Sequence, residues 1–184
     1  MSIDGPLQAK LQIDFAALAK EEVRGSPTFA KVESIASALR GYLNEERAQQ
    51  LILERHILNA KSQLIQEIFL EEAIRLGFED EKNGLFSSYE VSALRPDYFC
   101  QVDDTGILLE VERGKTTINN MDLLDLWKCH ICEHASYLFL VVPKVRLSAN
   151  GSAIRTFAYV RSRLAPFFER RNYVNVDAVY LFGY

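Results

Sequence analysis

RPDYFCQVDDTGILLEVE, residues 95–112, contains two runs of β-forming residues on either side of a turn. Residues 96–102 and 107–112 are rich in aromatic and branched aliphatic side chains, which are typical of strands. Between them, Asp103-Asp104-Thr105-Gly106 has the polar and glycine composition of a β-turn. The stretch therefore predicts a β-hairpin, and the rest of the fold can be built outward from it.

Three carboxylates of this hairpin are candidates for a shared site. Glu110 and Glu112 project from the same face of the second strand, about 6.5–7 Å apart, because strand side chains alternate. Asp97 can join them if it lies on the adjacent strand across the turn. Like charges on an otherwise apolar strand repel each other and resist burial, and a divalent cation would relieve both costs. Clustered carboxylate oxygens suit a hard cation such as Mg²⁺.

Outside the hairpin, hydrophobic spacing predicts alternating helices and strands. Ser26 and Pro27 suit the start of a helix, and Gly77 suits the end of one. Trp127 and most other aromatic residues are expected in the core. The predicted helices cover residues 6–24, 27–42, 44–77, 118–132 and 152–171, and the further strands cover residues 85–91, 136–142 and 176–182.

This order predicts an α/β fold with a mixed central sheet flanked by helices. Residues 1–43 are expected to be an added N-terminal helical segment, and residues 44–184 are expected to form the sheet-containing domain. At 184 residues the chain is long enough to bury a substantial core.

Arg95-Pro96-Asp97, followed after a turn by Glu110-Val111-Glu112, resembles the motif of the PD-(D/E)xK nucleases. The order of elements over residues 44–143 is also similar to the core of that superfamily. The resemblance implies a restriction endonuclease-like fold and hydrolysis of DNA phosphodiester bonds with Mg²⁺ or Mn²⁺. Asp97 and Glu110 would then hold the metal, and Glu112 would bind the metal or orient the attacking water.

The chain departs from this motif at Glu112, where the superfamily usually has a lysine. Some type II restriction endonucleases have a glutamate at this position. The missing ammonium group could come from Lys115, reaching back from the loop after the strand, or from Lys128 on the next helix. The sequence leaves both alternatives open.

Glu72 is a further candidate metal ligand. It shares a stripe of its predicted helix with Leu51, Leu58 and Ile65, so it should face the sheet. In the superfamily that the motif resembles, the helix before the sheet often contributes an acid. The alternative interpretation is a salt bridge with Arg75 at the edge of the stripe.

Composition points to a soluble protein in a reducing compartment. The chain has three cysteines, and an odd number argues against a disulfide framework. No apolar run is long enough to span a bilayer, and the first residues lack the pattern of a signal peptide. We therefore expect a cytoplasmic protein without a membrane partner.

The basic residues are unevenly distributed. The net charge is −4, yet residues 144–171 contain seven lysines and arginines and one acid. Such a stretch could contact the phosphates of DNA beside an acidic metal site, or it could be a solvated helix face. A homodimer would suit the cutting of both strands of a duplex, although no residue pattern indicates one.

Cys129, His130, Cys132 and His134 form a second group of potential metal ligands. Structural zinc needs four ligands, and the second pair is missing unless Cys100 comes close. Packing at the end of a helix is the alternative and is the one we expect.

Two further functions compete with the leading hypothesis of a Mg²⁺-dependent deoxyribonuclease. A catalytically degenerate nuclease fold could serve as a DNA-binding or protein-interaction module, and the altered lysine position favours this alternative. The chain could also be a structural subunit of a larger complex. Because fold does not determine function, retained affinity for divalent metals would distinguish the first hypothesis from the others.

Overall fold

The predicted hairpin is present in the computed structural model, where β3 (Tyr98–Val102) and β4 (Thr105–Val111) pair in antiparallel fashion. Asp103 adopts a left-handed backbone conformation (φ 53°) in the turn. Gly106 has no room for a side chain, since an added Cβ would lie 2.8 Å from the carbonyl oxygen of His134. The structure describes residues 12–56, 63–80, 95–113, 116–117, 119–147 and 152–184.

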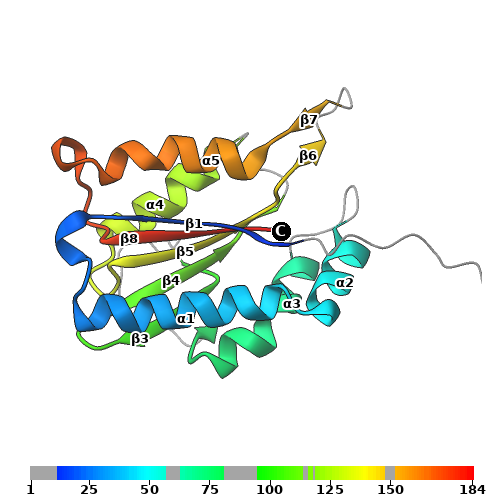
Figure 1. Ribbon diagram of the computed structural model, residues 1–184, viewed down its shortest axis with the longest axis horizontal. Helices are drawn as coiled ribbons and strands as arrows, with labels where there is room; N and C mark the ends of the chain where they lie inside the picture. Colours follow the sequence, from blue (N-terminus) through cyan, green and yellow to red (C-terminus); the bar gives the residue numbers. More distant parts are fainter. Residues whose placement is uncertain (1–11, 57–62, 81–94, 114–115, 118, 148–151) are drawn as a thin grey trace, which may run out of the picture.

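The hairpin belongs to a six-stranded mixed sheet with the strand order β1-β8-β5-β4-β3-β2 (Figure 1). Neighbouring strands β4, β5 and β8 are parallel, whereas β1, β2 and β3 run antiparallel to their partners. The remaining strands of this sheet are β1 (Asp14–Ala19), β2 (Glu79–Asp80), β5 (Tyr137–Val142) and β8 (Ala178–Gly183). A separate two-stranded ribbon pairs β6 (Arg146–Leu147) with β7 (Ala153–Ile154).

Helices cover both faces of the sheet, as the mixed α/β class requires (Figure 1). One face is covered by α1 (Pro27–Leu43) and α3 (Gln63–Arg75), with α2 (Glu46–Arg55) beside them; the other is covered by α4 (Met121–Ile131) and α5 (Thr156–Leu164). Short 3-10 helices are η1 (Glu21–Val23), η4 (Ala165–Phe168) and η5 (Arg170–Asn172). Within the described residues, no helix has both the length and the apolar character needed to cross a membrane.

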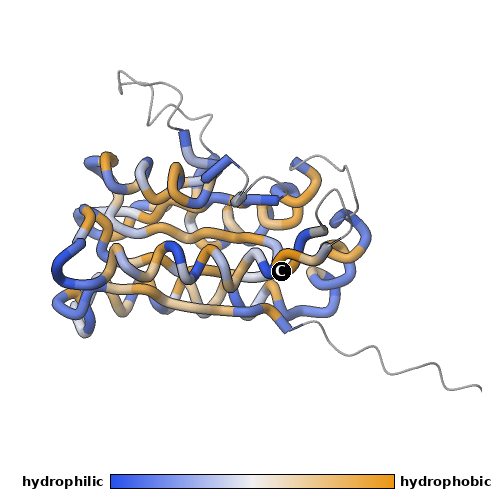
Figure 2. Tube along the Cα trace, turned by 90° about the horizontal axis from the view of Figure 1, so that it is seen from above, coloured by the Kyte–Doolittle hydropathy of each residue, from blue (hydrophilic) through white to orange (hydrophobic). Residues whose placement is uncertain are grey.

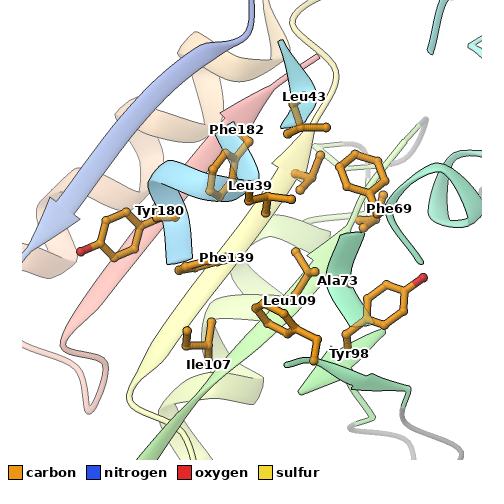
Figure 3. Close-up of a cluster of buried hydrophobic side chains, with 14 of the residues drawn as sticks. Leu39, Leu43, Phe69, Ala73, Tyr98, Ile107, Leu109, Phe139, Tyr180 and Phe182 are labelled. Carbon is orange, nitrogen blue, oxygen red and sulfur yellow. The ribbon is translucent and has the colours of Figure 1, made fainter. Parts of the chain in front are cut away.

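Each face of the sheet has its own hydrophobic core. Strand alternation sends Ile107 and Leu109 toward α1 and α3, where the ring centroids of Phe139 and Tyr180 lie 5.3 Å apart in an edge-to-face contact (Figure 3). Leu108 and Leu138 face the opposite way and pack against α4 and α5. In Figure 2 the central strands are hydrophobic, whereas the helices alternate between hydrophobic and hydrophilic positions. Because both faces of the sheet are buried, the alternation of side chains along β4 determines which face carries its acidic residues.

The N-terminal prediction needs correction. A helix was expected over residues 6–24, but Asp14–Ala19 forms β1, which pairs with β8 in register Phe15↔Phe182. Alanine and leucine favour a helix locally, but the backbone hydrogen bonds to β8 override that preference. Residues 12–43 are therefore part of the sheet and its core, not a separate helical extension, because Val32 of α1 is also fully buried there.

Other predicted elements are confirmed or shortened. Helix α1 begins where expected, with the Ser26 hydroxyl accepting a 3.1 Å hydrogen bond from the Phe29 N–H. The long helix expected over residues 44–77 contains α2 and α3, and Gly77 follows α3 with φ 90°. Helix α5 ends at Leu164, two residues before Pro166, which is the second residue of η4. The strand expected over residues 85–91 lies outside the described residues.

Gly106→Ala should lower the free energy of unfolding by about 1–3 kcal/mol, because the new methyl group would overlap a backbone carbonyl. Gly41→Ala is the matched control: nothing lies near its Cβ position in α1, and alanine favours helices, so stability should rise by up to about 1 kcal/mol. Urea unfolding of both variants measures the difference. Equal stability of the two variants would contradict the close packing of β4 at Gly106.

Candidate active site

Asp97 lies beside β4, opposite Glu110. The register Tyr98↔Leu109 continues by one residue to bring these two positions together at the end of the hairpin. Asp97 Oδ2 accepts a 2.8 Å hydrogen bond from the N–H of Val111, and its Oδ1 accepts one of 2.8 Å from the side chain of Gln66. The Asp97 carboxylate is therefore fixed between β4 and α3.

Glu110 points into the layer between β4 and α4, and its side chain is almost fully buried. Glu112 follows β4 and is less buried. Its N–H donates a 2.8 Å hydrogen bond to the carbonyl of Val141, and its carbonyl accepts one of 3.0 Å from the Tyr184 hydroxyl. These backbone contacts fix Glu112 at the end of the sheet where β5 and β8 also terminate.

Lys128 of α4 brings a positive charge to these acids. Its Nζ lies 2.9 Å from Glu110 Oε1 and 3.0 Å from Asp125 Oδ1. All three side chains are at least nine-tenths buried, with exposed fractions of 9%, 5% and 0% for Lys128, Glu110 and Asp125. Of the two lysines considered as substitutes for the missing motif lysine, Lys128 reaches Glu110, whereas Lys115 lies outside the described residues.

Burial and mutual repulsion make these carboxyl groups weak acids. Burial, reinforced by the charge of Asp125, raises the pKa of Glu110 well above its usual value, although Lys128 opposes the shift. The same two causes raise the pKa of Glu112 to about 7. Burial raises the pKa of Asp125 to about 6, against the opposing effect of Lys128. Burial alone would lower the pKa of Lys128, but Glu110 and Asp125 raise it by more, so its amine stays protonated.

Helix α4 buries an acidic face that the hydrophobic pattern did not reveal. Asp122 and Asp125 are fully buried, while Trp127, expected in the core, is 45% exposed. The leucines near Trp127 suggested the wrong buried face. Asp122, Asp125 and Lys128 recur every three residues, a spacing that places them on one side of a helix and could have identified this face.

Arg163 of α5 compensates part of this acidity. Its guanidinium lies 3.3 Å from Asp122 Oδ1 and donates a 2.8 Å hydrogen bond to Asn120 Oδ1. Burial still raises the pKa of Asp122 despite the nearby Arg163 charge. Arg163 therefore links α5 to the first turn of α4.

Glu72 is buried on α3, as its stripe predicted, and it pairs with Arg75, whose Nε donates a 2.7 Å hydrogen bond to Glu72 Oε2. This is the salt bridge considered as the alternative to a metal-binding role. None of the described contacts of Glu72 joins it to Asp97 or Glu110.

The cysteine and histidine group is used for packing. Cys129 and Cys132 are buried in the core between the sheet and helices α4 and α5, while Cys100 belongs to the core on the opposite face. His130 Nδ1 accepts a 2.8 Å hydrogen bond from the N–H of Asn175. These contacts agree with the expected helix-end packing.

The carboxylate oxygens of this cluster are ligands that suit a hard divalent cation. The ammonium group of Lys128, however, already lies among them. Within the residues that the structure describes, no three acidic, histidine or cysteine side chains stand close enough together to hold a metal. Asp125 Oδ2 is nevertheless buried without a hydrogen-bond donor, and Lys128 contacts the other oxygen of that carboxylate. The cluster is therefore short of positive charge.

Comparison with protein-family models, with curated proteins and with solved structures gives no match to this chain. Function must therefore be argued from the site itself.

Lys128→Met should lower the free energy of unfolding at pH 8 by about 3–5 kcal/mol, because it leaves buried carboxylates without a counter-charge. The loss should be smaller at pH 5, where the raised pKa values let Glu110 and Asp125 take up protons. Lys31→Met removes an exposed pair with Asp103 and should cost at most about 1 kcal/mol at either pH. A pH-independent loss for Lys128→Met, measured by urea unfolding, would contradict the charge network.

Glu112→Gln should become more stabilising, relative to the unchanged protein, as the pH rises. A carboxyl group whose pKa is raised to about 7 by folding destabilises the folded state progressively between its ordinary pKa of 4.5 and about 7. The amide removes this penalty, so the difference in unfolding free energy should grow by up to about 3 kcal/mol from pH 4.5 to pH 8. Urea unfolding in buffer containing a chelator tests it, and a constant difference would count against the buried environment of Glu112.

Proposed function

We propose that the protein is a Mg²⁺-dependent endonuclease with a restriction endonuclease-like core, which hydrolyses phosphodiester bonds of DNA. The observation that carries the proposal is the 2.9 Å contact between Lys128 and Glu110, beside Asp97 and Glu112. This contact places the ammonium group of Lys128 at the end of the hairpin. The motif usually has a lysine where this chain has Glu112, and Lys128 would supply the missing positive charge. The order of elements around the hairpin also supports the resemblance.

Asp97, Glu110 and Glu112 would hold the cation. Mg²⁺ or Mn²⁺, when bound, would lower the pKa of water and stabilise charge on the scissile phosphate. Asp125 shares Lys128 with Glu110 and so belongs to the same charge network. Carboxylates alone suit these hard ions better than they suit zinc.

Two side chains of the protein can then take part in proton transfer and charge stabilisation. If Asp97 and Glu110 hold the cation, Glu112 is the carboxylate left to orient the attacking water and accept its proton. The water oxygen bonds to phosphorus, the bond from phosphorus to the departing sugar oxygen breaks, and that oxygen gains a proton from solvent. Lys128, held by Glu110 and Asp125, can donate a hydrogen bond to a phosphate oxygen.

One observation favours the alternative of a DNA-binding module without catalysis. Lys128 already satisfies Glu110, and within the described residues no three potential ligands are arranged to hold a metal. In that case the Lys128 pair would stabilise the fold and no cation would be needed. Metal-dependent cleavage therefore separates the two functions.

Cleavage of supercoiled plasmid and of single-stranded DNA in Mg²⁺ or Mn²⁺ tests the proposal. We expect Glu110→Gln to reduce cutting at least 100-fold, since it removes a charged ligand while leaving Lys128 paired with Asp125. Asp103→Asn is the matched control, because Asp103 lies in the turn at the other end of the same hairpin, and this variant should cut normally. Calorimetry with Mn²⁺ should show binding that weakens in Glu110→Gln.

The outcomes are distinct. Cutting that survives in Glu110→Gln would place the activity elsewhere, either at another site or in a contaminant. Absence of both cutting and metal binding would favour the module. Glu72→Gln decides the separate question of Glu72: loss of metal binding in this variant with an intact fold would restore its predicted role as a ligand.

A further inference from the structure

The charge of the protein is divided between two regions. The chain has 21 basic and 25 acidic residues, and residues 144–171 hold seven of the basic and one of the acidic residues. This segment therefore carries a formal charge of +6, while the rest of the chain carries −10. Such a separation favours a polyanionic partner for the basic segment.

The basic segment itself reaches both ends of the sheet. Arg146 of β6 and Arg155, the residue before α5, lie where the chain leaves β5, whereas Arg170 and Arg171 belong to η5, before β8 begins at the other end. The acidic site shares the first of these ends, because the N–H of Glu112 bonds to Val141 of β5. Arg146 and Arg155 therefore belong to the part of the basic segment that lies at the same end of the sheet as Glu112.

The base of the β6–β7 ribbon holds these two arginines close together. Arg146 pairs in register with Ile154, which directly precedes Arg155. Figure 1 shows the ribbon rising away from the sheet beyond the first turn of α5. Arg155 is exposed, and neither arginine forms an ion pair within the part of the chain that the structure describes.

Helix α5 adds to the positive potential at this point. Its first turn contains no acidic residue, so no carboxylate of that turn offsets the charge of Arg155, although the Phe157 N–H already donates a hydrogen bond to the carbonyl of Lys144. Arg146 follows Val141, which lies beside Glu112, by five residues along the chain, a span of at most about 18 Å. That span corresponds to about five base steps of duplex DNA at 3.4 Å each.

We propose that the base of the β6–β7 ribbon, with Arg146, Arg155 and the first turn of α5, binds the phosphate backbone of duplex DNA a few base steps from the acidic site. The inference rests on the proposed function in so far as DNA is the substrate. It does not require that the protein cuts DNA.

The test is the binding of a fluorescent DNA duplex of about 25 base pairs. Its affinity is measured by fluorescence anisotropy over a series of salt concentrations in a buffer that contains a chelator. The variant Arg146→Gln/Arg155→Gln should bind at least about tenfold more weakly, and its slope of log K against log salt should be smaller by about 2. Arg170→Gln/Arg171→Gln removes the same charge from the other end of the sheet and should bind within about twofold of the unchanged protein.

The variant Arg146→Lys/Arg155→Lys distinguishes a loss of folding from a loss of contact with DNA. It keeps both positive charges and should retain most of the affinity. Equal weakening in the two glutamine variants would overturn the proposal, because it would indicate attraction by overall charge. Unchanged affinity in Arg146→Gln/Arg155→Gln would overturn it as well.

These outcomes do not depend on catalysis. Binding that needs Arg146 and Arg155 in a protein that never cuts DNA would support the contact surface and reject the nuclease. Metal-dependent cutting together with binding that ignores both arginines would support the nuclease and reject this surface.

Discussion

The candidate site depends on the Lys128 ammonium held between Glu110 and Asp125. Burying each of these groups costs several kcal/mol of hydration, and the cost is offset because Lys128 Nζ lies within 3.0 Å of both carboxyl groups. Lys128 comes from α4 and Glu110 from β4, so the same contact sets the rotation of the helix over the sheet. The packing of α4 and the charge balance of the site are therefore one constraint.

The hairpin was predictable because its signals are local. Turn residues and strand alternation within residues 95–112 are enough to place Asp97 near Glu110 and to put Glu110 on one face. Strand β1 was not predictable in this way. Its residues favour a helix, and what makes them a strand is pairing with β8 at the far end of the chain, as in Asp14↔Gly183. A sequence window cannot contain that partner.

The burial of the α4 acids was missed for a different reason. Hydrophobic spacing assumes that a helix buries its apolar side, but α4 buries Asp122 and Asp125 and leaves Trp127 largely exposed. That arrangement is stable because Arg163 and Lys128 supply positive charge from opposite sides of the buried acids. The sequence could name Lys128 as a candidate, but placing it beside Glu110 required knowledge of how the helix is rotated.

The imbalance of charge at the site bears on what the protein does. Four carboxyl groups, those of Asp97, Glu110, Glu112 and Asp125, influence one another, and Lys128 contacts two of them, Glu110 and Asp125. A phosphate group would add more negative charge, so it can approach only if cations accompany it. A module that merely binds DNA gains nothing from such an excess of acid, which repels the ligand and destabilises the fold near neutral pH. A site that took up a divalent cation would instead turn the same excess into affinity for the metal, which is the expectation behind the proposed function.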